Sequence, residues 1–274
     1  MQRIEYDLIF CVVVFVTGLT IGCDRPVQPR TPLVSVAEDQ LTQVSIINAL
    51  MLGEYNGVLP VENLLRYGNF GLGTCDHLDG ELIVLDGVAY QARSDGTVQQ
   101  ISPQDKTPFA VVTPFHKDGD FPCPLAQSLD QLDAQLNKQL PSQNSFVAVR
   151  IEAKLKSIHL RSVPRQEPPY ALLADVATKQ TTWTRKNVEG TLIGIRCPGW
   201  TAGLNVPGFH WHFLSGDRSL GGHVIDCQIE SGKVSFDVCD SWLIKLSDSV
   251  EFQQADFSRN LSKELESVER SRGK

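Results

Sequence analysis

Positive charge is scarce in this sequence. Its 274 residues include 25 lysines and arginines against 32 aspartates and glutamates, so the formal net charge is −7 and the isoelectric point is about 5.4. The basic residues are scattered, and their one dense group lies close to the C-terminus. This composition gives no electrostatic basis for general nucleic-acid binding, and we expect no nucleic-acid partner.

Closely spaced cysteine pairs are also absent. The seven cysteines contain no C-x-x-C spacing, which excludes the usual signature of a dithiol redox motif or a cysteine-rich zinc module. We interpret the five beyond Cys23 as mostly buried thiols, with room for one disulfide that the sequence does not assign: Cys75, Cys123, Cys197, Cys227 and Cys239.

Long apolar runs are rare, and the one that stands out covers residues 8–22. Its length fits the core of a signal peptide and is short for a membrane span. We predict a signal peptide at residues 1–22, a tether rich in Pro, Arg and Gln at residues 23–37, and a folded domain at residues 38–274.

The apolar run ends in Gly22-Cys23, which resembles the lipobox of bacterial lipoproteins, where the cysteine becomes lipidated. Thr20 and the acidic Glu5 and Asp7 depart from that pattern. We expect an exported protein in the cell envelope, either tethered to the membrane by a lipid on Cys23 or secreted. An uncleaved N-terminal anchor is the alternative, and it would also hold the domain outside the cytoplasm.

The rest of the chain is rich in strand patterns. Hydrophobic residues make up 42% of the sequence, which is enough for a sizeable core in one or two domains. Alternation and turn residues predict strands at residues 81–85, 88–92, 109–112, 146–158, 188–195 and 233–237. Helical spacing predicts helices at residues 44–52, 61–67, 129–140 and 257–270. These patterns indicate a β-rich α+β fold.

The most informative stretch is Gly-Phe-His-Trp-His-Phe at residues 208–213. Three of the six histidines, His210, His212 and His223, fall within fourteen residues. Residues two apart on a strand share a face, and the turn-like residues 215–219 predict that His223 returns on the adjacent strand. Three imidazoles converging on one hairpin predict an open, catalytic metal site, since closed zinc sites usually have four protein ligands. A hairpin with core or surface histidines is the simpler alternative.

Five ordered motifs resemble the bacterial α-acetolactate decarboxylase family. They span residues 40–270 in order: Asn-Phe-Gly-Leu-Gly-Thr (69–74), Leu-Asp-Gly-Glu-Leu-Ile (78–83), Ser-Val-Pro-Arg-Gln-Glu-Pro-Pro-Tyr (162–170), Pro-Gly-Phe-His-Trp-His-Phe-Leu (207–214) and Asp-Arg-Ser-Leu-Gly-Gly-His-Val (217–224). This resemblance implies a catalytic domain of two closely packed, mixed β-sheet and barrel-like subdomains with few helices and a metal site on a β-hairpin. It also implies a homodimer.

The resemblance further implies which residues form the site. One Zn²⁺ per chain would be bound by His210, His212 and His223. Glu81, Arg161 and Thr74 match family residues of the active site, and a glutamate near the C-terminus matches Glu269. The tail has Arg270 where the family tends to have glycine, so Glu266 is a neighbouring candidate. Taken alone, each of these acidic, basic and hydroxyl side chains is typical of an ordinary turn or surface position.

The implied reaction converts 2-acetolactate to acetoin and carbon dioxide. Breaking the C–C bond of a β-keto acid requires an electron sink, which a zinc ion would provide by stabilising an enediolate. The Arg161 guanidinium suits the substrate carboxylate, and a buried carboxylic acid can protonate one face of the product carbanion. We assign the proton-donor role to Glu81, with Glu269 as positioning partner or second acid.

Two other interpretations fit parts of the sequence. A cupin-like metal enzyme acting on another small keto or hydroxy acid also carries histidines on strands. However, cupins place a glutamate shortly after H-x-H, and here none follows His212 before Glu230. An inactive exported homologue that serves in binding would be expected to lose ligands or the acid, which this chain retains. The remaining histidines, His77, His116 and His159, are expected outside the site.

Overall fold

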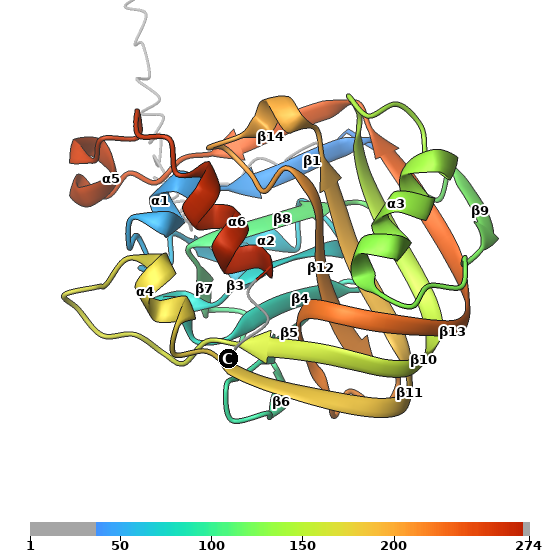
Figure 1. Ribbon diagram of the computed structural model, residues 1–274. Coiled ribbons are helices and arrows are strands. Elements are labelled where there is room, and N and C mark those ends of the chain that lie inside the picture. The colour runs from blue at the N-terminus through green and yellow to red at the C-terminus, as the bar shows by residue number, and fades with distance from the viewer. Residues whose placement is uncertain (1–36, 271–274) are drawn as a thin grey trace, which may run out of the picture. The chain divides into compact units, whose positions relative to one another are not determined.

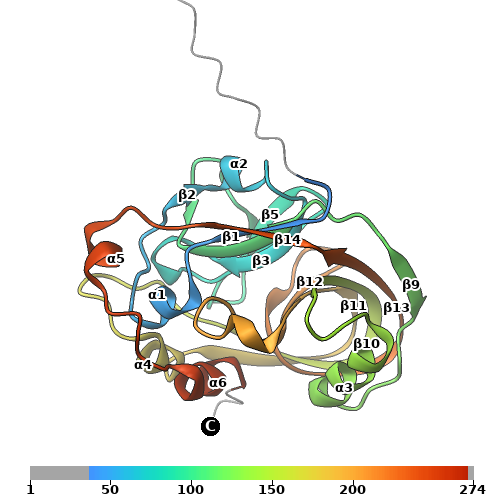
Figure 2. The ribbon, with the colours of Figure 1, turned by 90° about the horizontal axis from the view of Figure 1, so that it is seen from above.

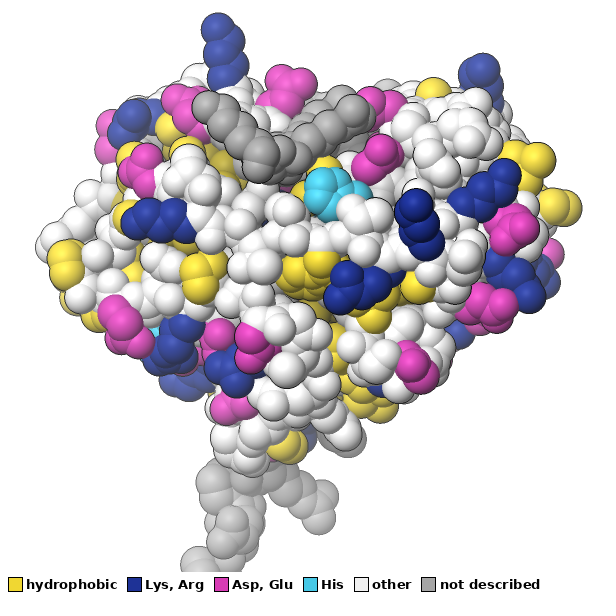
Figure 3. Space-filling model, turned by 60° about the horizontal axis from the view of Figure 1, so that its bottom comes forward, with side chains coloured by type: hydrophobic (Ala, Val, Ile, Leu, Met, Phe, Trp, Pro, Cys, Tyr) yellow, Lys and Arg dark blue, Asp and Glu magenta, His cyan; other side chains and the backbone are white. Residues whose placement is uncertain are grey.

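The computed structural model describes residues 37–270, which belong to one compact unit. The predicted signal peptide, Cys23 and nearly all of the predicted tether lie outside the described residues. Among the residues described, no helix combines the length and apolar character needed to cross a membrane. On the face seen in Figure 3, acidic and basic side chains are interspersed rather than gathered in one patch.

Seven strands form the first sheet, in which all neighbours are antiparallel except β1 and β14. Their spatial order is β14-β1-β8-β3-β4-β5-β6 (Figure 1). Asp86 and Gly87, both with positive φ, make the tight hairpin turn that the sequence predicts between β4 and β5. The strands are β1 (Gln40–Val44), β3 (Phe70–Thr74), β4 (Glu81–Leu85), β5 (Val88–Ala92), β6 (Val98–Gln100), β8 (Phe109–Thr113) and β14 (Ser241–Lys245).

The second sheet is closed into a barrel-like shape. Strand β10 pairs with both β11 and β13, and β12 joins those two, while β9 extends the sheet beyond β13. The predicted strand at residues 233–237 is confirmed, and it forms the last part of the long strand β13 that begins at Gly221. The strands are β9 (Gly119–Pro122), β10 (Phe146–Ser162), β11 (Thr181–Cys197), β12 (Gly208–Ser215) and β13 (Gly221–Cys239), and a separate short pair is β2 (Leu59–Pro60) and β7 (Lys106–Thr107).

Helices are few and short. The α-helices are α1 (Ile47–Met51), α2 (Val61–Leu64), α3 (Leu129–Gln139), α4 (Leu173–Ala177), α5 (Val250–Gln254) and α6 (Ser262–Arg270), and the 3₁₀ turns are η1 (Asp76–Leu78) and η2 (Gly199–Thr201). Helix α3 begins where the Ser128 hydroxyl caps the backbone N–H of Gln131, and it ends just before Pro141 as the sequence predicts.

The helix predicted at residues 44–52 is wrong in its first turn. Val44 completes β1, where it pairs with Lys245 and Ala110, and Ser45 has a φ of 60°, which a right-handed helix does not allow. The helix therefore begins only at Ile47. The helices predicted at residues 61–67 and 257–270 are likewise shorter in the structure.

The two sheets pack on each other through a shared core (Figure 2). Leu72, Ile83 and Phe109 of the seven-stranded sheet belong to the same buried cluster as Ile193 and Ile195 of β11. A second cluster fills the barrel and is covered by α3. This arrangement confirms the predicted β-rich fold of two closely packed subdomains with few helices.

All five cysteines in the described part of the chain are free and buried. Burial raises the pKa of the Cys123 and Cys239 thiols to about 12, which keeps them protonated and unreactive at neutral pH. The prediction of buried thiols is confirmed, and the disulfide that the sequence left open is absent among these residues.

Candidate active site

Strand register brings three of the predicted residues side by side. His212 on β12 lies opposite His223 on β13, and His223 lies opposite Arg161 on β10. The close approach of β13 to β10 needs Gly222, because a Cβ there would lie 2.8 Å from the Arg161 carbonyl oxygen. His212, His223 and Arg161 thus occupy three neighbouring strands of the barrel.

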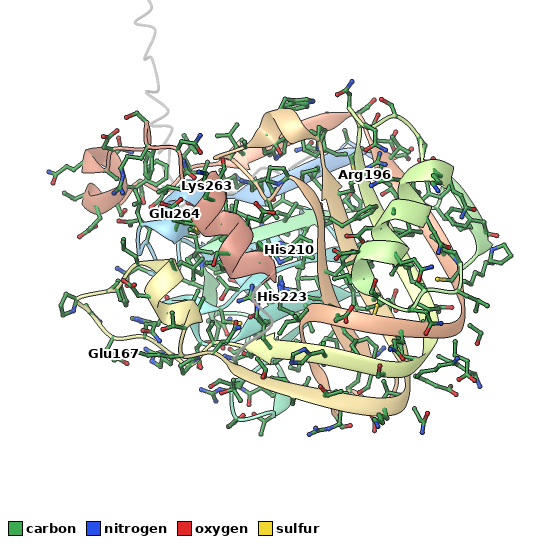
Figure 4. All side chains as sticks on the ribbon, in the orientation of Figure 1. Glu167, Arg196, His210, His223, Lys263 and Glu264 are labelled. Atoms are coloured by element: carbon green, nitrogen blue, oxygen red, sulfur yellow. The ribbon has the colours of Figure 1, made fainter. Side chains whose placement is uncertain are left out.

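Alternation along β12 separates the histidines from the aromatic residues. Phe209, Trp211 and Phe213 turn into the barrel core, where the Trp211 indole N–H donates to Asp133. His210 and His212 therefore point to the other face, toward the seven-stranded sheet. Figure 4 shows His210 and His223 next to the C-terminal end of α6, while Lys263 and Glu264 mark its far end.

The three histidines form a compact cluster. Their ring centroids are 4.9 to 5.5 Å apart, and one ring nitrogen from each lies within 4.8 Å of the others. His210 Nε2 and His223 Nδ1 are 3.1 Å apart. The hairpin places all three imidazoles around one point.

The protonation states of the three imidazole rings are those needed to bind a cation. The His212 Nδ1–H donates to the Leu82 carbonyl oxygen at 2.9 Å, which leaves Nε2 with a lone pair. This buried nitrogen has no hydrogen-bond partner among residues 37–270. Burial and the Arg161 charge lower the pKa of His210 to about 3, and the pKa values of His212 and His223 are also far below the ordinary value, chiefly because of burial. All three rings are therefore neutral and available as metal ligands.

Glu81 faces this cluster from the opposite sheet. It opens β4 after Gly80, whose φ of 85° makes the preceding turn, and its Oε2 is 3.5 Å from His212 Nε2. The residue is only 6% exposed, and burial raises the pKa of its carboxyl to about 7 against the opposing pull of Arg161. A carboxyl in this state can hold a proton near neutral pH.

Thr74 lies directly opposite Glu81 in the sheet. Its hydroxyl donates to the Gly80 carbonyl oxygen at 2.8 Å, which fixes the turn before Glu81. Its own backbone oxygen accepts from the Thr107 hydroxyl. Thr74 therefore lies at the site and holds the Glu81 strand in place.

Helix α6 contributes Glu269. Its Oε2 lies 3.7 Å from His210 Nε2 and 3.6 Å from His223 Nε2, and Oε1 lies 3.7 Å from Arg161 Nη2. Burial raises the pKa of Glu269, and Arg161 opposes the rise. The alternative Glu266 is exposed, so the geometry favours Glu269.

Arg161 is a buried cation with spare donors. It is 4% exposed, its Nε has no hydrogen-bond partner in the described part of the chain, and its contact with Glu269 is longer than a hydrogen bond. An unsatisfied buried guanidinium is costly unless a ligand fills its donors. Its planar fork suits a carboxylate.

Comparison with known proteins assigns the chain to a family. The sequence profile of the alpha-acetolactate decarboxylase family matches residues 41–259. The chain is 44% identical to the alpha-acetolactate decarboxylase of Methanosarcina mazei over 234 residues, covering 85% of this chain and 81% of that protein. Its identity to the Brevibacillus brevis alpha-acetolactate decarboxylase is 36%, over 93% of this chain and 91% of that protein.

A solved structure gives the same answer. The alpha-acetolactate decarboxylase of Bacillus subtilis strain 168 superimposes with a TM-score of 0.82 at 33% identity, covering 86% of this chain and all of that one. The chain belongs to the alpha-acetolactate decarboxylase family. This membership excludes the cupin interpretation.

In this acetolactate decarboxylase-family fold, a cavity of about 40 Å³ lies among the polar site residues. Its polar lining includes Glu81, Arg161, His210, His223 and Glu269. Sequence reasoning missed its apolar wall, because the residues of that wall carry no ionisable group. Leu78 and Val163 belong to quoted motifs, and they gave the only available signals. The wall is formed by Ile47, Leu50, Leu78, Phe109, Val163, Leu173 and Val268.

The other three described histidines lie outside the triad. His116 and His159 take no part in the cluster, and His77 lies in η1 with its ring against Tyr170. Arg165 and Glu167 form an exposed ion pair at 3.0 Å, and Glu167 lies out on its loop, away from the labelled histidines (Figure 4). The charged contact of Arg161 is with Glu269 and not with this pair.

Proposed function

We propose that a divalent metal ion held by His210, His212 and His223 is the centre at which this protein decarboxylates 2-acetolactate to acetoin and carbon dioxide. Family membership carries the reaction: the chain is a carboxy-lyase that acts on acetolactate. The observation that supports a bound metal is the buried, neutral His cluster, in which His212 Nε2 has no hydrogen-bond partner among the described residues.

Zinc is the ion we propose, one per chain. Neutral imidazoles suit Zn²⁺, and three protein ligands leave a position open for substrate. When bound, the ion supplies a Lewis acid that stabilises the negative charge left as carbon dioxide departs. The Glu269 carboxylate, whose Oε2 lies 3.6 Å from His223 Nε2, is close enough to offset part of the positive charge of the ion.

The chain's own residues orient the substrate and deliver a proton. Arg161 offers free donors to the substrate carboxylate, the group that leaves as carbon dioxide. The Glu81 carboxyl then donates its proton to the carbanion left behind, and burial keeps that proton in place near neutral pH. Leu78 and Val163 provide apolar contacts for the methyl groups.

The metal assignment is tested by the His212→Ala variant. Two imidazoles rarely hold zinc tightly, so we expect its zinc content to fall from one per chain to near zero, with loss of acetoin formation. His159→Ala is the matched control, since His159 lies on β10 outside the triad. Full zinc content in His212→Ala would refute the proposed ligand set.

We also propose that the protein is exported and acts outside the cytoplasm. The apolar run at residues 8–22 and Cys23 support this. Intact cells should then convert added acetolactate to acetoin, and labelled fatty acid should appear on the protein if Cys23 is lipidated. Activity confined to the cytosol would contradict export.

A homodimer is the oligomeric state we propose from the family resemblance. Large apolar side chains that remain exposed, including Trp200, Leu246 and Val250, are consistent with a further contact surface. Light scattering of the purified protein should give twice the chain mass, and a single-chain mass would contradict the proposal.

A further inference from the structure

The segment from Pro164 to Tyr170 belongs to a quoted motif, yet the reaction uses none of its side chains. Tyr170 instead reaches back to the turn before β4. Its hydroxyl lies 2.5 Å from His77 Nδ1 and donates to Asn56 Oδ1 at 2.7 Å. Because a hydroxyl has one proton and gives it to Asn56, His77 Nδ1 must carry the hydrogen and donate to the Tyr170 oxygen.

His77 and Leu78 form an unfavourable backbone turn. Both have a φ of 57°, a left-handed conformation that side chains other than glycine and asparagine rarely adopt. Such a turn persists only when its surroundings hold it. Here the His77 N–H donates to the Tyr55 carbonyl oxygen, and the Gln166 N–H donates to the His77 carbonyl oxygen, both at 2.8 Å.

This turn sets the position of two parts of the site. Leu78, the second left-handed residue, lies on the wall of the cavity. Glu81 follows three residues later, after Gly80, at the start of β4. A shift of the turn would therefore move both the apolar wall and the buried carboxyl.

We propose that His77 and Tyr170 are a positioning pair that holds this left-handed turn, and through it Leu78 and Glu81, in the geometry the reaction needs. Neither residue lines the cavity or belongs to the cluster of three histidines, so the pair acts through other residues. This inference deepens the proposed function and rests on it.

The structure offers a matched control. Tyr55 and Tyr170 are packed edge to face at 5.1 Å, and the Tyr55 hydroxyl donates to the Ala171 carbonyl oxygen at 2.9 Å. Tyr55→Phe and Tyr170→Phe therefore each remove one hydroxyl that ties down the same segment. Only Tyr170→Phe also removes the hydroxyl that bonds to the His77 ring.

The test measures kcat, KM, zinc content and Tm of the zinc-loaded full chain with 2-acetolactate. We expect Tyr170→Phe to lower kcat about tenfold, in line with the cost of small misplacements near a reacting centre, with KM and zinc content little changed. Tyr55→Phe should stay within about twofold of the parent kcat although it also lowers Tm, since it removes a buried hydroxyl that bonds the same segment but not His77.

Two variants of His77, the partner of Tyr170, test the same inference. His77→Asn keeps an N–H donor near the position of Nδ1 and tolerates a left-handed φ, so its kcat should remain within about threefold of the parent, because the hydrogen bond that positions the turn survives. His77→Ala removes the donor and should lower kcat as Tyr170→Phe does.

Equal kcat losses in Tyr55→Phe and Tyr170→Phe, or in His77→Asn and His77→Ala, would overturn the positioning role and leave a purely structural one. The His77 pair decides the question if Tyr170→Phe does not fold. Failure of the proposed function is distinct, because the unsubstituted protein would then form no acetoin.

Discussion

Glu81 shows how burial converts an ordinary turn residue into a candidate acid. The sequence places it after Asp-Gly at a strand start, a position that is usually solvated. In the structure the strand carries it under the His cluster, where it is 6% exposed and the pKa of its carboxyl rises to about 7. The same desolvation that disfavours the carboxylate prepares the proton for transfer.

Glu81→Gln tests this role. Glutamine keeps the shape and hydrogen-bonding capacity but cannot donate a proton as an acid, so we expect kcat to fall by about 10²- to 10⁴-fold. Zinc content should remain at one per chain, because Glu81 is not among the three ligands. A variant with the parent rate would show that the proton comes from elsewhere.

Most polar site residues could be predicted from the sequence, because they lie in or next to recognisable motifs. His210, His212, His223, Glu81, Arg161 and Thr74 all stand in or beside quoted motifs, and the structure brings them together. The apolar wall and the Leu82 carbonyl that fixes the His212 tautomer could not be predicted. Neither a leucine side chain nor a backbone oxygen has a chemical signature in a single sequence.

At the scale of elements, helix α6 is the part of the fold that completes the site. The family match ends at residue 259, before α6 begins, so the placement of Glu269 rests on geometry. Leu265 and Val268 lie on the buried face of this helix, and Leu261, one residue before its start, is also buried, in line with the predicted helical spacing. Their packing holds Glu269 against Arg161 and the histidines.

Leu265→Ala tests the dependence of the site on this packing. Truncating a buried leucine costs about 2 to 5 kcal/mol of unfolding free energy, and loosening α6 should also lower kcat/KM by moving Glu269. The control is Leu132→Ala on α3, which is also buried but lies over the barrel core. Leu132→Ala should lose stability with kcat/KM unchanged, and an equal fall in kcat/KM for both variants would contradict a specific role for α6.

Element boundaries were harder to predict than element types. The segment at residues 44–52 has helical spacing throughout, but sheet pairing with β14 and β8 takes Val44, and the positive φ of Ser45 separates strand from helix. These are long-range contacts, which no local pattern contains. The hairpin at residues 81–92 was predictable because its Asp-Gly turn is local.

At the scale of the whole molecule, Asp237 links the two sheets. It lies on β13 with no exposed surface, accepts from the His116 N–H at 3.3 Å and contacts the Thr113 hydroxyl of β8. Burial raises its pKa from 3.8 to about 6, the His116 N–H opposes the rise, and Asp118 and Asp39 add to it. The folded protein therefore binds more protons at this carboxyl than the unfolded chain does.

The raised pKa of Asp237 makes the stability of the folded protein depend on pH. Between pH 4 and pH 6 the folded state holds the extra proton, so stability falls as the pH rises through this window and stays reduced above it. Asp237→Asn should remove the cost of burying a charged carboxylate and stabilise the protein by roughly 1 to 3 kcal/mol at pH 8. It should have little effect at pH 4. Chemical denaturation at both pH values measures this.

Asp120→Asn is the control for that prediction. Asp120 lies on the surface and pairs with Lys117 and Lys233, which lower its pKa through hydrogen bonds. Its substitution should not stabilise the protein at pH 8. Equal stability of Asp237→Asn and the parent at pH 8 would mean that Asp237 carries no buried charge.

The most direct measurement of the central claim is acetoin formation from racemic 2-acetolactate by the purified protein, with chelator and after adding zinc back. The account predicts acetoin release that the chelator abolishes and that zinc restores, because the three histidines hold the ion on which the reaction depends. Undiminished acetoin formation by protein shown to be free of metal would contradict a metal-centred reaction. A folded, zinc-loaded protein that forms no acetoin would contradict the proposed activity itself.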